Sequence, residues 1–286
     1  MRARTVAAVI ISAALLLGGA VLLVGDDVKQ EMKTAEIQPY TVTVEVQEQL
    51  DSITAELIQK TDVTEPVTTF AEEDTAETEA ETEHIQAYDT LPEETLRELI
   101  SAAQTLTDAY PDAIGWLILP GTNIQYPLMQ GEDNAFYLHH AYDGSKLNAG
   151  SVFLDYRCEK HLLNGINVVY GHNMKNGTML AGLAKFEDAE YFNAHRYGWL
   201  ATPDCVYRLD FFSLAHADCN DAIYDGSQTI TSWMIRLRGL SGIYEPISYS
   251  EDDRFISLST CTNATGNDRT ILTGRLVMMT GGDIDS

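Results

Sequence analysis

The sequence predicts a mostly β domain, either a β-barrel or a β-sandwich, preceded by one helix. Short apolar runs of strand composition recur between residues 114 and 277, and residues common in turns separate them. Two runs with helical character interrupt this series, and no internal repeat is evident. Many short strands joined by turns are typical of barrels and sandwiches, in which few strand edges stay exposed.

A helix is predicted to open the domain at residue 90. Thr90 and Glu93 have the spacing of a capping box. In this motif the threonine side chain caps the helix, and the glutamate side chain accepts a hydrogen bond from the backbone N–H of the threonine. Pro111 should end the helix, because the residue before a proline avoids the helical conformation. Between them, apolar residues recur at helical spacing and form one face for packing: Leu96, Leu99, Ile100, Ala103 and Leu106.

The predicted strands follow this helix. They cover residues 114–119, 124–129, 151–155, 166–170, 198–201, 206–215, 256–259 and 271–277. Residues 134–140 are predicted to form a short helix or a turn. Residues 178–185 and 230–240 are predicted helices within the series of strands.

The N-terminus has the pattern of a membrane anchor. Residues 5–24 carry no charge and have about the 20 residues that a helix needs to cross a bilayer. Arg2 and Arg4 precede this run and acidic residues follow it, which predicts a cytoplasmic N-terminus and an extracellular remainder. A cleaved signal peptide is the competing interpretation, but its core is usually shorter and no clear A-x-A site follows Val24. We therefore expect residues 1–25 to be a cytoplasmic tip and an uncleaved, single-pass anchor in the cell membrane.

Residues 26–89 differ in composition from the rest of the chain. Residues 71–83 contain seven acidic side chains and no Lys or Arg. Such a segment buries too little apolar surface to fold, and repulsion between its charges extends it. We expect a disordered extracellular stalk, although a solvated tail without a specific role fits the same composition. The folded domain is then predicted to cover residues 90–286.

Composition excludes several classes of function. The formal net charge of the 286 residues is −25, which disfavours nucleic acid as a partner because phosphates require a cationic surface. The four cysteines match no zinc spacing, and no ligand-rich acidic loop lies within the predicted domain, so we expect neither a metal nor a cofactor. Cys205 and Cys219 can pair only if they lie on adjacent strands, which the sequence leaves open.

Three residues indicate acyl chemistry. Cys261 ends one predicted strand and Arg269 begins the next, so a thiol can attack a carbonyl while a guanidinium holds the oxyanion. His172 follows the strand at residues 166–170 and enters a polar loop, where functional residues concentrate, which makes it a candidate acid and base. Each residue alone also has an ordinary structural interpretation, since a free cysteine is often a buried apolar residue.

The combination of motifs is far more specific. Residues 257–261 read SLSTC, Arg269 follows eight residues after the cysteine, and residues 170–174 read YGHNM. Together they resemble the sortase family of cysteine transpeptidases, and class B sortases in particular. The family consensus around the nucleophile is T-L-x-T-C, in which Ser257 replaces the first threonine. The resemblance covers residues 90–279, and the N-terminal anchor fits the same family.

The resemblance implies a closed sortase-type β-barrel with an N-terminal helix and a helix-bearing loop, residues 218–246, before the nucleophile strand. It implies secreted proteins with a C-terminal sorting signal as substrates, cleaved through a thioester on the outer face of a Gram-positive membrane. The acyl group would pass to a cell-wall amine, either of a peptidoglycan precursor stem or, as the weaker possibility, of a pilin lysine.

The resemblance also implies a role for each site residue. Cys261 would be the nucleophile, His172 the acid and base, and Arg269 the oxyanion stabiliser, while Ser259 and Thr260 would line the substrate site. Two alternatives stay open on the sequence. A cysteine peptidase would resolve the same thioester with water, and an inactive anchored binding module would keep the fold without turnover, although all three catalytic candidates are present.

Overall fold

The computed structural model describes Ser52, Ala55 and residues 90–262 and 266–281. The predicted anchor at residues 5–24 and almost all of the predicted stalk lie outside the described residues. Within the described part of the chain, none of the helices combines the length and the apolar character that crossing a bilayer requires.

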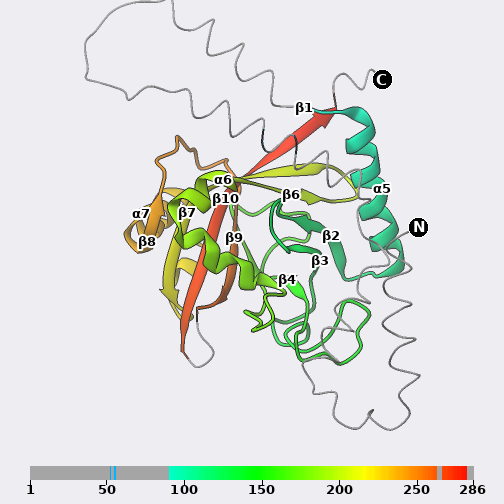
Figure 1. Ribbon diagram of the computed structural model, residues 1–286, viewed down its shortest axis with the longest axis horizontal. Coiled ribbons are helices and arrows are strands. Elements are labelled where there is room, and N and C mark those ends of the chain that lie inside the picture. The colour runs from blue at the N-terminus through cyan, green and yellow to red at the C-terminus, as the bar shows by residue number, and fades with distance from the viewer. Residues whose placement is uncertain (1–51, 53–54, 56–89, 263–265, 282–286) are drawn as a thin grey trace, which may run out of the picture. The chain divides into compact units, whose positions relative to one another are not determined.

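The strands close into a barrel, as predicted (Figure 1). The sheet order is β1-β10-β9-β5-β4-β3-β2-β6-β7-β8, and an additional pairing of β10 with β7 closes the sheet on itself. The closed part consists of β2 (Ala113–Ile118), β3 (Gln125–Met129), β4 (Val152–Leu154), β5 (Ile166–Tyr170), β6 (Tyr197–Ala201), β7 (Val206–Asp218), β9 (Phe255–Cys261) and β10 (Asp268–Gly281). Closure removes the free strand edges that would otherwise invite pairing with other chains.

Two short strands lie outside the closed ring. β1 (Thr90–Leu91) pairs in parallel with the end of β10, and β8 (Ser241–Tyr244) pairs with the second half of β7. The sequence predicts neither of them, because strands of two and four residues are too short for a period-2 pattern to show.

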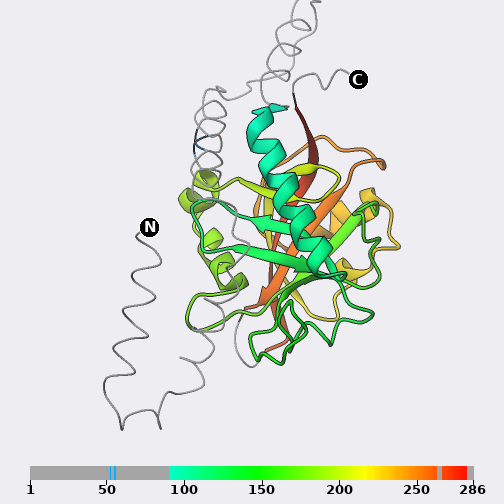
Figure 2. The same cartoon turned by 90° about the vertical axis from the view of Figure 1, so that its right-hand side faces the viewer.

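The N-terminal helix α5 (Glu93–Ala109) packs against the barrel at β2, β6 and β7, and Figure 2 shows it lying across these strands. Its predicted apolar face is confirmed, since Leu99, Ala103 and Leu106 are fully buried in one cluster with residues of the sheet. The predicted capping box is wrong. The helix begins after Pro92, which provides no side-chain cap, because Thr90 belongs to β1 instead.

A second apolar cluster lies under α7 (Ile230–Leu240), whose bounds match the prediction. Trp233 packs on Phe255 of β9 with ring centroids 5.4 Å apart, and its indole nitrogen donates to the carbonyl of Ile223 in η3 (Ala222–Tyr224) at 3.1 Å. The carboxylate of Glu251 accepts from the first amides of the helix, Ile230 N and Thr231 N. The helix-bearing loop is therefore packed onto the strand that carries Cys261.

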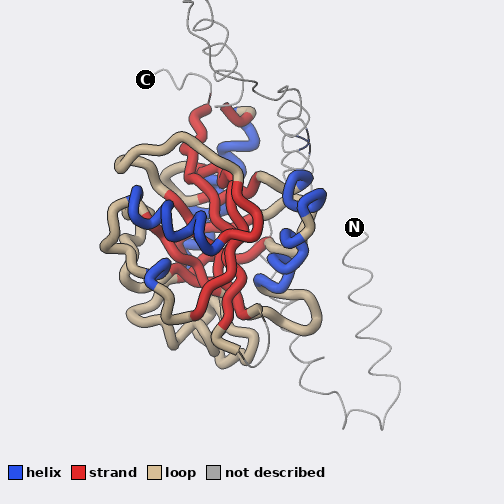
Figure 3. The backbone as a smooth tube through the Cα atoms, turned by 90° about the vertical axis from the view of Figure 1, so that its left-hand side faces the viewer, coloured by secondary structure: helices blue, strands red, loops and turns tan. Residues whose placement is uncertain are grey.

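The other elements between strands are short. Figure 3 shows α7 on one side of the strands and η2 (Leu180–Glu187) with α6 (Ala189–Ala194) on the other. The helix predicted at residues 178–185 is thus a 3-10 helix shifted by two residues, and residues 134–140 form turns rather than a helix. All four cysteines are free thiols, and the length of β7 separates Cys205 from Cys219.

Candidate active site

Cys261 and Arg269 face each other across two neighbouring strands. They are direct register partners in the antiparallel pair of β9 and β10. The next pair outward is hydrogen-bonded, with Thr262 N donating to Asp268 O at 3.0 Å. Since bonded and non-bonded pairs alternate in an antiparallel ladder, Cys261 and Arg269 form a non-hydrogen-bonded pair, in which side chains approach more closely. Both side chains are half-buried.

The parallel pairing of β5 with β9 brings His172 to the same edge. The register pairs Val168 with Ser257 and Tyr170 with Ser259. Continued by two residues along each strand, the same register places His172 opposite Cys261. Alternation along both strands puts these side chains on one face of the sheet. The order across the sheet is therefore His172, Cys261 and Arg269, on β5, β9 and β10 or directly after their ends.

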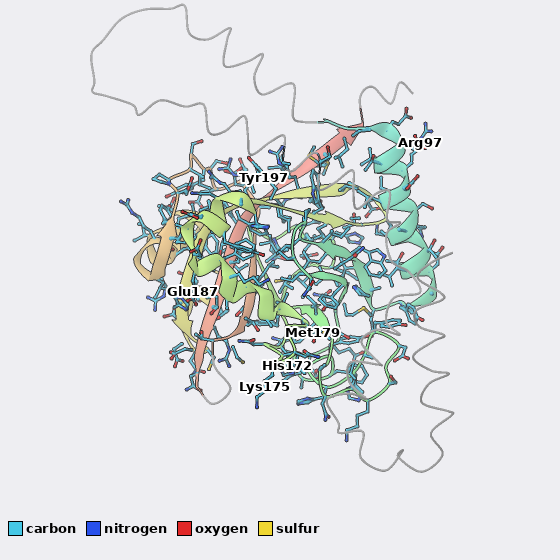
Figure 4. The ribbon with its side chains drawn as sticks, in the orientation of Figure 1. Arg97, His172, Lys175, Met179, Glu187 and Tyr197 are labelled. Carbon is cyan, nitrogen blue, oxygen red and sulfur yellow. The ribbon has the colours of Figure 1, made fainter. Side chains whose placement is uncertain are left out.

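The imidazole of His172 is held by a backbone carbonyl. Its Nε2 lies 2.9 Å from the carbonyl oxygen of Leu138, in the long segment between β3 and β4. A carbonyl only accepts, so this bond requires Nε2–H and leaves the lone pair of the neutral ring on Nδ1. Figure 4 shows His172 beside Lys175 at the end of the domain where β10 begins, and the ring of His139 lies 6.3 Å from that of His172.

Ser259 and Thr260 are both buried beside Cys261, at 1 % and 3 % exposure. The hydroxyl of Ser259 shares a hydrogen bond of 2.9 Å with the phenol of Tyr224. The hydroxyl of Thr260 donates to Gly171 O at 2.7 Å. Each side chain therefore has a partner within the protein, and a direct contact of either one with substrate remains a prediction.

Tyr224 also lies at this site, although it is not among the residues predicted from the sequence. Burial raises the pKa of Tyr224 to about 12, although its bond with Ser259 and the nearby charge of Arg269 both lower it. The phenol thus stays protonated beside the Cys261 face. Burial and then the carboxylate of Asp155 raise the pKa of Tyr170, whose ring lies 6.1 Å from that of Tyr224. In the sequence, Tyr224 lies in a polar segment without periodicity, so no signal marked it.

A cavity of about 310 Å³ opens on this same face of β5. Its lining combines apolar strand residues with a charged and polar rim, and includes Arg157, Cys158, Ile166, Val168, Tyr224 and Ser227. Among the residues that the structure describes, no group of three or more His, Cys, Asp and Glu side chains is arranged to hold a metal ion.

Two known proteins are similar to this chain in sequence. The chain is 31% identical over 172 residues to sortase B of Listeria monocytogenes and covers 70% of that protein and 58% of its own length. It is 27% identical over 165 residues to sortase B of Staphylococcus aureus, covering 68% of that protein and 56% of itself. No family model matches the chain.

A solved structure shares the fold. A Streptococcus pyogenes class B sortase involved in pilus biogenesis superimposes with a TM-score of 0.56 at 28% identity, covering 60% of this chain and 96% of the other. The resemblance that the SLSTC and YGHNM motifs suggested is confirmed by this likeness of sequence and fold. The chain belongs to the sortase B family and is a class B sortase, a cysteine transpeptidase that acts on proteins carrying a sorting signal.

Proposed function

We propose that His172, Cys261 and Arg269 are the residues with which this sortase breaks and remakes an amide bond. The observation that supports the proposal is their order across β5, β9 and β10 at one edge of the barrel, on one face of the sheet. A nucleophile, a proton carrier and a fixed cation at neighbouring positions support this role, because acyl transfer needs such proximity.

The reaction proceeds through a thioester. The thiol of Cys261 gives its proton to His172 as the sulfur adds to the carbonyl carbon of the scissile peptide bond, and the guanidinium of Arg269 donates to the resulting oxyanion. His172 passes this proton to the departing amine as the carbon–nitrogen bond breaks. The incoming amine then adds to the thioester and gives a proton to His172, and the expelled thiolate of Cys261 takes that proton back. The proton gained and lost by His172 and the bond formed and broken at sulfur balance over the cycle.

The acceptor is proposed to be an amine of a peptidoglycan precursor stem. A pilin lysine is the second candidate, favoured by one observation, that the Streptococcus pyogenes class B sortase of similar fold is involved in pilus biogenesis. Both candidates supply a primary amine, so the chemistry at Cys261 and His172 is the same. The cavity beside β5 is proposed to receive part of the sorting peptide, because it opens on the face that carries Ser259 and Tyr224.

The enzyme is proposed to work outside the cell, fixed to the membrane. The uncharged run at residues 5–24, with arginines before it and acidic residues after it, supports a single-pass anchor with the catalytic domain outside. Labelling intact cells with a membrane-impermeant maleimide tests this topology. We expect thiols of the chain to react before lysis, and labelling that appears only after lysis would contradict the proposal.

Incubation of the full chain with a library of sorting peptides, with and without a primary amine, tests the reaction. Mass spectrometry should detect a peptide–amine adduct whose yield rises with the amine concentration, together with a thioester on Cys261. Peptide release that is independent of amine, with no adduct, would indicate a peptidase that uses water instead. Comparing a stem peptide with a pilin peptide as the amine distinguishes the two acceptors.

A further inference from the structure

The residue directly after His172 makes an unusual contact with the residue proposed as nucleophile. The side-chain amide of Asn173 donates to the carbonyl oxygen of Cys261 at 2.8 Å, although the two residues are 88 positions apart. The side chain of Asn173 is exposed, so this bond is not a by-product of packing in the core.

The ladder between β5 and β9 explains the position of this bond. Gly171 N donates to Ser259 O at 3.2 Å, and a parallel ladder repeats its bonds every two residues along each strand. The next bond of the series would therefore run from the backbone N–H of Asn173 to Cys261 O. The structure fills that place with the side-chain amide of the same residue.

This exchange of donors frees the backbone of Asn173 to leave the sheet. Asn173 forms an isolated antiparallel bridge with Met179, and Leu180 N donates to His172 O at 3.0 Å. Hydrogen bonds between its two ends therefore hold the segment from His172 to Leu180 as a loop. Met179, at the end of the loop, has φ 56° and donates its amide to the phenol of Tyr126 at 2.9 Å. Figure 4 shows His172, Lys175 and Met179 gathered at this end of the domain.

His172 is consequently held on two sides. Before it in the sequence, Gly171 is bound to Ser259 and Thr260, and after it Asn173 is bound to Cys261. Its imidazole is bound to Leu138 O. Of these contacts only that of Asn173 connects the histidine loop to the backbone of the cysteine itself.

We propose that Asn173 is a positioning residue, which sets the distance and orientation of His172 relative to Cys261 through its bond to the Cys261 carbonyl. The role requires a donor on a short side chain. Alanine removes the bond, and an aspartate of the same shape places a carboxylate, which only accepts, against a carbonyl oxygen. Because the side chain is exposed, the loss of one such bond changes the stability of the domain little, whereas a displacement near 1 Å at a reacting centre costs about 100-fold in rate.

The test uses Asn173→Ala and Asn173→Asp in the full chain, with two measurements. The first is kcat and KM for the amine-dependent reaction, which rests on the proposed function. We expect kcat to fall about 10- to 100-fold while KM changes less than about twofold. The second is the rate at which iodoacetamide alkylates Cys261, followed by mass spectrometry over a pH series. It needs no substrate, and we expect its pH profile to shift in both variants, since the His172 ring no longer has a fixed place beside the thiol.

Asn176→Ala is the matched control, because Asn176 is an exposed asparagine of the same loop whose side chain, among the described residues, bonds Thr178 two residues away. It should keep kcat and the alkylation profile within about twofold of the parent chain. The proposal is overturned if Asn173→Ala retains the parental kcat, if only KM changes, or if Asn176→Ala is equally impaired. Failure of the parent chain to form an adduct would instead count against the proposed function, and the alkylation profiles would still decide the role of Asn173.

Discussion

The two ends of the long strand β10 are held by different kinds of contact. At the far end, where Val206 pairs with Met279, both residues join the apolar cluster under α5 and are nearly inaccessible to solvent. At the other end, where Arg269 pairs with Cys261 of β9, the side chains of Asn173 and Thr260 donate single hydrogen bonds to backbone carbonyls. Apolar burial is non-directional and tolerates small shifts, whereas a hydrogen bond depends on position and angle. Stability is therefore expected to depend on the first end and reactivity on the second.

The largest expected effect is at Cys261. Cys261→Ala removes the atom that forms the thioester, so neither cleavage nor adduct should be detectable by mass spectrometry. Cys205→Ala is the control from the opposite end of β10, where Cys205 directly precedes β7, and it should retain turnover. Residual cleavage in Cys261→Ala would show that another group carries the chemistry.

Arg269→Lys is expected to have the next largest effect. A lysine keeps the charge but lacks the planar fork of donors, so we expect kcat to fall roughly 100- to 1,000-fold, as when one oxyanion donor is lost. Steady-state kinetics with a sorting peptide measures it. Arg275→Lys, six residues further along β10 in an ion pair with Asp253, is the control and should keep kcat. Equal losses in both variants would indicate a general effect of altering this strand.

At the apolar end the expected effect is on stability. Leu99 of α5 is fully buried, so Leu99→Ala leaves a cavity and should lower the free energy of unfolding by about 2–5 kcal/mol. Urea unfolding measures this loss. The folded fraction should retain the parental kcat, because the helix contacts β2, β6 and β7 rather than the site. A reduced kcat at full folding would mean that the two ends are coupled.

The smallest expected effect is on the stability that Asp155 contributes, which depends on pH. Burial raises the pKa of Asp155, but the bonds from Arg157 outweigh it and hold the pKa below its ordinary value of 3.8. The lowered pKa means that the stabilisation is complete above pH 3.8 and is lost as the pH falls through the folded pKa. Asp155→Asn should therefore lower the free energy of unfolding by about 1–3 kcal/mol at pH 7, and by progressively less as the pH falls.

Urea unfolding of Asp155→Asn at several pH values checks this prediction, with Leu99→Ala as the reference. The cost of the apolar substitution should be independent of pH, since no titrating group is removed. If the loss of unfolding free energy in Asp155→Asn were the same at every pH in the acid range, the ion pair of Asp155 with Arg157 would not contribute as described.

Much of the architecture follows from the sequence alone. The apolar runs located the strands of the barrel to within one residue, except at the ends of β7, β9 and β10, because alternation and turn residues are local signals. α7 was predicted with its observed bounds. Cys261 and Arg269 stood at facing strand ends in the sequence, and their antiparallel register follows once the two strands pair. The SLSTC and YGHNM motifs indicated the family before any geometry was known.

Only the tertiary structure decided how these parts meet. Thr90 shows why. The capping box predicted there does not form, because Thr90 instead pairs with a residue of β10 about 190 positions away. The phenol of Tyr224 beside Ser259, the Leu138 carbonyl at His172 and the Asn173 amide at Cys261 all depend on contacts across long sequence separations. A carbonyl carries no sequence signal, because every residue has one. The amino-acid sequence thus determined which groups are present, while the closure of the barrel and its register decided which of them lie within bonding distance.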